Sequence, residues 1–137
     1  MDCSEVRRVS GWIETAVVAE RRCFTKSMTY NADRRLYFVG VHPRKLDEDG
    51  DAVLLCGGAA GRLRDVFVIP WDVFFDALRG GEPISTHTDG VRLQYKFYVR
   101  DRQGTWIMDV QRGPRPGLDI GTWLHDPVDA LEAVKKL

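Results

Sequence analysis

The predicted fold follows from one stretch of the sequence, VRLQYKFYVRDRQGTWIMDVQR, residues 91–112. The odd positions from Val91 to Val99 are apolar, and the even positions are mostly polar. Because successive side chains of a strand point to opposite faces, this alternation predicts a strand with one buried face. Residues 101–104 are expected as a four-residue turn containing a glycine, and a second strand follows. The stretch therefore predicts an antiparallel hairpin.

The two strands of this hairpin have a preferred alignment. Pairing Arg100 with Thr105 places apolar side chains opposite one another on one face of the hairpin. On the other face the same alignment places Lys96 opposite Asp109. Matched apolar pairs and opposite charges across a ladder both stabilise a sheet. We therefore expect Lys96 and Asp109 to be cross-strand neighbours.

Further apolar segments predict the rest of the sheet. Residues 35–42 and 52–56 are expected as strands joined by a polar loop, and the continuously apolar residues 66–69 are typical of a central strand. Short helices are expected at 73–79 and 128–137, each preceded by an aspartate that can cap it.

The amino-terminal segment, residues 5–26, has apolar spacing that fits one face of a helix, with an initial strand as the alternative. All these elements predict one α+β domain over residues 1–137. Its sheet is mostly antiparallel with about five strands, and its helices pack on one face.

Composition excludes several classes of protein. The chain has 137 residues, and twenty basic side chains balance twenty acidic ones, which argues against a histone-like protein. It contains no apolar run long enough to cross a membrane, and its first residues lack the pattern of a signal peptide. Its three cysteines are odd in number and far apart, which favours a reducing compartment. We therefore expect a cytoplasmic protein with no membrane partner.

The even-numbered face of the first hairpin strand suggests a function. It carries, in order, Arg92, Gln94, Lys96, Tyr98 and Arg100. Cations at every second position with an interleaved aromatic suit a phosphate backbone with unstacked bases. The hypothesis is recognition of DNA or RNA, in which the three cations contact phosphates, Gln94 reads a base edge and Tyr98 stacks. The alternative is a solvated face whose charges serve only solubility.

Two other side chains could join such a site. Trp71 follows the central strand, and its ring could stack on a base, with core packing as the alternative. His87 lies in a polar loop before the hairpin and could contact a ligand, with loop hydrogen bonding as the alternative. No second histidine or cysteine lies at ligand spacing from His87, so we expect no metal site and no cofactor.

A nuclease is a second hypothesis. Gln94 and Lys96 have the spacing of the second half of a PD-(D/E)xK motif, with Gln in place of the acid, and Asp72 and Asp109 are candidate carboxylates. Only in this case would Mg²⁺ be a cofactor. A site with Gln in that position is a poor one for Mg²⁺, which prefers charged oxygen ligands.

The order of elements over residues 65–124 resembles small DNA-recognition domains of restriction-type proteins. An apolar strand, a proline, an aromatic residue and a short helix come first, and the hairpin and the segment Leu118–Ile120 follow. The resemblance implies DNA recognition in a restriction or phage-defence context, and it transfers no catalytic residue. A third hypothesis is a protein–protein interaction module, in which zero net charge reflects a mixed-charge surface for a protein partner.

Overall fold

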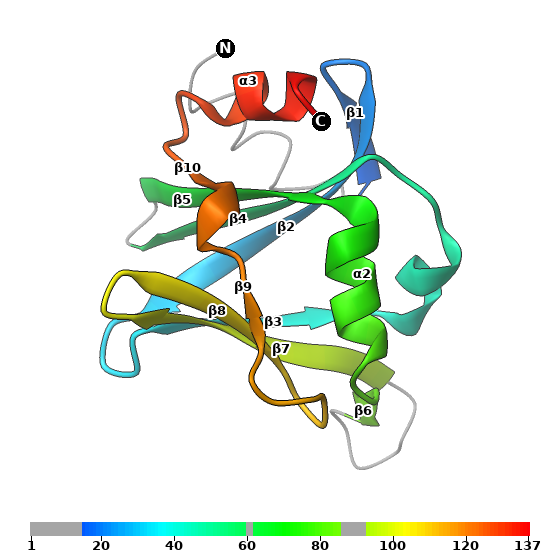
Figure 1. Ribbon diagram of the computed structural model, residues 1–137, viewed down its shortest axis with the longest axis vertical. Helices are drawn as coiled ribbons and strands as arrows, with labels where there is room; N and C mark the ends of the chain where they lie inside the picture. The colour runs from blue at the N-terminus through cyan, green and yellow to red at the C-terminus, as the bar shows by residue number, and fades with distance from the viewer. Residues whose placement is uncertain (1–14, 60–61, 86–92) are drawn as a thin grey trace.

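The computed structural model describes residues 15–59, 62–85 and 93–137, which form a curled ten-stranded sheet (Figure 1). The elements are, in chain order, β1 (Thr15–Val18), β2 (Arg21–Asn31), β3 (Leu36–Val41), η1 (Pro43–Asp47), β4 (Ala52–Ala59), β5 (Arg62–Pro70), α2 (Trp71–Arg79), β6 (Ile84–Ser85), β7 (Leu93–Arg102), β8 (Thr105–Val110), β9 (Leu118–Asp119), η2 (Gly121–Trp123), β10 (Leu124–His125) and α3 (Ala130–Lys135). Neighbouring strands follow the order β10-β5-β4-β2-β3-β7-β8-β9, with β1 beside β2 and β6 beside β7. Within these ranges no helix is long and apolar enough to span a membrane.

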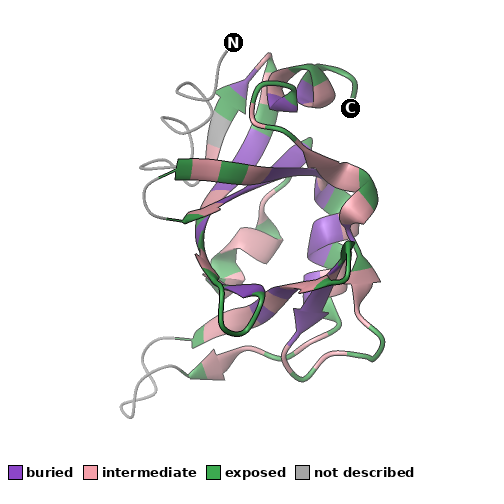
Figure 2. Ribbon diagram, turned by 90° about the vertical axis from the view of Figure 1, so that its left-hand side faces the viewer, coloured by how far each residue is buried: buried purple, intermediate pink, exposed green. Residues whose placement is uncertain are grey.

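The long strand β2 makes the sheet curl. Most of β2 pairs with β1 and, in parallel, with β4, whereas its last residues, Tyr30 and Asn31, pair with β3. The strand therefore belongs to both parts of the sheet. The sheet curls so that these two parts face each other, in the shape of a half-barrel (Figure 2). Helix α2 lies beside both halves and contributes to the core between them (Figure 1).

The main core fills the inside of this curl. Phe67 and Ile69 of β5 face Phe97 and Val99 of β7 across it, and the edge of the Phe74 ring on α2 packs against Phe97 at 5.5 Å between ring centroids. Phe97 and Val99 are therefore buried as the alternation predicts and Tyr95 is partly buried, whereas Leu93, at the start of β7, is 43% exposed. The even positions from Gln94 to Arg100 lie on the opposite, outward face.

A second core lies on the other side of β5. There Val66 and Val68 pack with Ala130 and Val134 of α3. Because alternate residues of β5 enter the two cores, the whole segment 66–69 is buried, and the prediction of a strand covered on both faces is confirmed.

The predicted fold class is wrong, because the protein is mostly β. The expected five strands are ten, and the two α-helices of the described ranges do not share one face: α2 packs in the main core and α3 in the second. Residues 15–26 belong to β1 and β2, not to a helix, and residues 5–14 lie outside the described ranges. Ala19 and Glu20 connect these strands with φ of 50° and 64°. Neither residue type commonly adopts positive φ, so the sequence does not predict a turn there.

The hairpin is confirmed, but its predicted alignment is wrong by two residues. Arg102, not Arg100, pairs with Thr105, and the turn consists of Gln103 and Gly104 alone. Both turn residues have positive φ, 54° and 87°, as the favoured two-residue hairpin turn requires. A shift of two leaves every side chain on its expected face and changes only its cross-strand partner.

Candidate nucleic-acid interface

The candidate site is the outward face of β3, β7 and β8, which we call the cation–aromatic face. It consists of Phe38, Gln94, Lys96, Tyr98, Arg100, Asp109 and Gln111. These residues share one side of the sheet because they occupy alternate or directly paired ladder positions. The structure therefore brings together four of the predicted nucleic-acid-binding residues, all on β7, and adds Asp109 of β8, a candidate carboxylate of the nuclease hypothesis. Two others, His87 and Arg92, lie outside the described residues.

An aromatic pair lies at the centre of this face. The Phe38 side chain is opposite Tyr98 in the ladder, with 5.1 Å between ring centroids, and Phe38 remains 47% exposed. Phe38 could not be predicted as a site residue from the sequence, because it lies within a continuous apolar run, residues 36–41, where no alternation marks the exposed position. An exposed, ordered aromatic ring on a sheet is the feature that a stacked base requires.

Cations surround both rings. Lys96 Nζ lies 4.8 Å from the Phe38 ring centroid, and the Arg100 guanidinium carbon lies 4.6 Å from that of Tyr98. At exposed positions such cation–π contacts contribute about 0.5–1 kcal/mol each, so they are weak enough to rearrange around a ligand. Gly40, opposite Lys96, makes room for this arrangement because a Cβ there would collide with Gln94 and approach Lys96 Nζ to 3.2 Å.

The Tyr98 ring is held by its hydroxyl group. Gln111, the residue after β8, donates a hydrogen bond of 3.0 Å from Nε2 to Tyr98 Oη. The backbone of Tyr98 is held in the strand and its hydroxyl group in this hydrogen bond, so the side chain loses little further conformational entropy when a ligand stacks on it.

A cleft of about 640 Å³ opens beside the aromatic pair. Phe38 and Tyr98 line one side, and Tyr30 and Arg34 from β2 and the following turn line the other. The Arg34 guanidinium carbon lies 5.6 Å from the Tyr98 ring centroid, and the turn is fixed by Asn31 Oδ1, which accepts a hydrogen bond from Arg34 N. The cleft is thus a concave, aromatic and cationic extension of the face.

Asp109 is surrounded by arginines. Its side chain is 3% exposed, and its carboxylate lies 3.0 Å from Arg100 Nε, 3.8 Å from Arg102 Nη2 and 3.0 Å from Arg115 Nη1. A carboxylate at this depth needs such partners, because burial without them is strongly unfavourable. The expected contact with Lys96 does not form, since the true register places Asp109 opposite Tyr98. Arg102 was not predicted for the same reason, and Arg115 was not predicted because it lies in the loop after β8, where no ladder position specifies its neighbours.

Neither Trp71 nor Asp72 joins this face. Trp71 is 2% exposed, packs against Phe75 at 4.7 Å between ring centroids with a tilt of 34°, and lies in the main core, so its ring offers no surface to a base. Asp72 is exposed in the first turn of α2, on the inner side of β7, whereas Asp109 lies on the outer side. Asp72 is therefore separated from the other three candidate nuclease residues, and within the described ranges no group of three potential metal ligands occurs.

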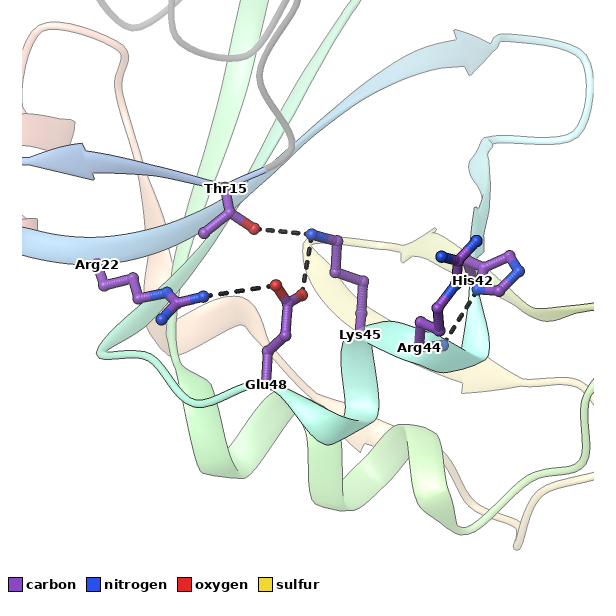
Figure 3. A network of polar contacts seen from close by, with 6 residues as sticks. All are labelled: Thr15, Arg22, His42, Arg44, Lys45 and Glu48. Atoms are coloured by element: carbon purple, nitrogen blue, oxygen red, sulfur yellow. Dashed lines mark hydrogen bonds and ion pairs between the residues drawn. The ribbon is translucent and has the colours of Figure 1, made fainter.

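A second polar cluster surrounds η1 (Figure 3). Lys45 Nζ lies 2.9 Å from Glu48 Oε2 and donates to Thr15 Oγ1, and Arg22 Nη2 donates to Glu48 Oε1 at 3.4 Å. A cavity of about 470 Å³ lies beside these residues. Because these charges pair with each other and join η1 to β1 and β2, this cluster stabilises the fold.

Comparisons with known proteins give no further information about this site. The chain matches no family model, no curated protein and no solved structure. The function is therefore inferred from the described residues alone.

Proposed function

We propose that the protein binds single-stranded nucleic acid on the cation–aromatic face. Bases would stack on Phe38 and Tyr98, Lys96 and Arg100 would contact phosphates, and Gln94 would meet a base edge. The observation that carries the proposal is the exposed Phe38 ring, ordered against Tyr98 and flanked by cations. The restriction or phage-defence context and a protein partner remain predictions.

The arrangement favours a single strand over a duplex. Within a duplex the faces of the bases are covered by their neighbours, so exposed protein rings find no partner. Unstacked bases do offer their faces, and each base stacked on an aromatic side chain contributes about 1–3 kcal/mol. The adjoining cleft adds Tyr30 and Arg34 to the surface that a second or third nucleotide could follow.

The direct test is fluorescence anisotropy with a labelled oligothymidylate of about 15 nucleotides, and its RNA counterpart, at low salt. Phe38→Ala should weaken binding about 5- to 150-fold, the loss of one stacked base. Val17→Ala is the matched control, because Val17 is exposed on β1, outside the face. Lys96→Gln should reduce the slope of log affinity against log salt by roughly 0.7, the contribution of one phosphate contact.

Two results would contradict the proposal. The first is the absence of oligonucleotide binding at any salt concentration. The second is binding that Phe38→Ala and Tyr98→Ala leave unchanged, which would place the nucleic acid elsewhere on the protein. Tighter binding of a duplex than of either of its strands would reject the preference for single strands.

A further inference from the structure

We infer that Arg100, Arg102 and Arg115 form a binding site for a terminal phosphate of the nucleic acid, with Asp109 as the residue that positions them. The inference rests on the proposed function and specifies which end group the strand would present. We call these four residues the arginine cluster.

The geometry places three guanidinium groups around one point. Each lies within 3.8 Å of the Asp109 carboxylate, although Arg100 and Arg102 come from β7 and Arg115 from the loop after β8. The carboxylate is buried, whereas the side chains of Arg102 and Arg115 are 65% and 61% exposed. Each guanidinium has five N–H donors, so donors of both exposed groups face the solvent beside their shared anchor.

The charge of the arginine cluster fits a phosphate monoester. Three arginines lie within ion-pair distance of one aspartate, so the net charge of the cluster is +2. A monoester carries about −1.5 to −2 near neutral pH, as in a phosphorylated side chain. An internal phosphodiester carries only one negative charge and would leave half of the cluster's charge uncompensated. The planar guanidinium also binds two phosphate oxygens at once, which a lysine cannot do.

The cluster is also preorganised, unlike an ordinary group of surface arginines. The Asp109 carboxylate holds Arg100 and Arg115 at 3.0 Å and lies 3.8 Å from Arg102 before any ligand arrives, so binding loses less side-chain entropy. The loop that carries Arg115 is held against β8, because Gly117 lies so close that a Cβ there would collide with Asp109 Oδ1 and Met108 O. The next carboxylate on this side of the sheet, Asp119, is engaged by Gly121 N at 2.9 Å.

The cluster adjoins the aromatic pair. Arg100 lies over the Tyr98 ring and also contacts Asp109, and Tyr98 and Asp109 are directly opposite in the ladder. Directly opposed side chains have Cβ atoms about 4.5–5.5 Å apart. A nucleotide stacked on Tyr98 would therefore have its own phosphate within reach of the cluster, which suits the last nucleotide of a strand.

The test compares three labelled oligothymidylates of one length, with a 5′-phosphate, a 3′-phosphate or hydroxyl groups at both ends. The wild-type protein should bind one phosphorylated form at least about fivefold more tightly than the hydroxyl form, and the favoured end identifies the polarity of the strand. The double variant Arg102→Gln/Arg115→Gln should bind all three forms equally. The control Arg44→Gln/Arg62→Gln removes the same charge from exposed positions outside the face and should keep the preference.

The outcomes separate the two proposals. Oligonucleotides that bind to the aromatic pair without preference for any end group would overturn the phosphate site and leave the proposed function intact. If no oligonucleotide binds, inorganic phosphate still tests the arginine cluster directly. At about 10 mM and equal ionic strength, phosphate should raise the Tm of the wild type above its value in chloride, and not that of Arg102→Gln/Arg115→Gln. Equal shifts in both proteins would reject the site.

Discussion

Asp109→Asn is the substitution that most directly tests how the arginine cluster is built. The carboxylate makes two contacts of 3.0 Å with guanidinium nitrogens and lies 3.8 Å from a third guanidinium. Hydrogen bonds to charged groups contribute about 1.5–3 kcal/mol each to stability. Two considerations lower the sum: Asn keeps one oxygen acceptor, and the guanidinium groups of Arg102 and Arg115 can turn to water because they are largely exposed. We therefore expect the free energy of unfolding to fall by about 2 kcal/mol.

Urea denaturation followed by tryptophan fluorescence measures this loss. For a chain of this length it corresponds to a decrease in Tm of about 6–10 °C. Asp119→Asn is the matched control: the same substitution on the same side of the sheet, at an exposed residue whose one hydrogen bond Asn can still accept. Its stability should stay within about 0.5 kcal/mol of the wild type. An equally small change for Asp109→Asn would refute the reasoning that a buried carboxylate holds the three arginines.

Three further predictions concern the core. Gly57→Ala should lower the free energy of unfolding by about 1–3 kcal/mol in urea denaturation, because the new Cβ would collide with the buried Tyr37 ring; a wild-type value would contradict the packing. Tyr37→Phe should cost about 1–2 kcal/mol in the same assay, since it removes the hydrogen bond of 2.6 Å that Tyr37 Oη donates to Asp65, and an unchanged midpoint would show that bond to be dispensable. Burial raises the pKa of Cys23 from 9.0 to about 11, so the folded protein retains a proton that the unfolded chain releases. The stability contribution of the Cys23 thiol should therefore be fully present below pH 9 and decline towards pH 11 by at most about 1.4 kcal/mol per pH unit. Cys23→Ala should flatten that decline between about pH 9 and 10. Equal slopes of stability against pH in the wild type and the variant would exclude the thiol as the cause.

Local periodicity predicted the faces of the strands well. The alternation of residues 95–100 identified which side chains of β7 face the core and which face outward, although Leu93 at the strand's start is exposed; the apolar run 66–69 identified a strand covered on both sides. Both results depend only on the geometry of a single strand, in which neighbouring side chains point in opposite directions. The predicted helix at 73–79 is likewise present within α2, bounded by its proline and glycine neighbours.

Features that depend on distant pairing were not predictable in this way. The parallel pairing of β2 with β4 joins residues about thirty positions apart, and no local pattern specifies it. The short strands β6, β9 and β10 have two residues each, too few for any periodicity. These strands and β1 account for most of the difference between the five strands expected and the ten found.

The candidate site combines both kinds of information. Gln94, Lys96, Tyr98 and Arg100 were predictable because they share the outward face of one strand. Their neighbours across the ladder were not, because two alignments that differ by two residues place the same side chains on the same faces. Such alignments keep the same faces and differ in the turn and in the cross-strand partners, and the turn conformation of Gln103 and Gly104 is what selects between them.

That selection changes the chemistry of the face. In the expected alignment Asp109 would neutralise Lys96, and the hairpin would present an ordinary pair of opposite charges. In the observed alignment Asp109 lies beside Arg100 and Arg102, while Lys96 lies over the Phe38 ring. One acidic side chain thus restrains two cations of β7 and a third from the loop after β8, and the aromatic pair retains its own cation. A protein with the same residues and the other alignment would have neither the arginine cluster nor this separation of charge, so the turn conformation specifies the site as much as the residues do.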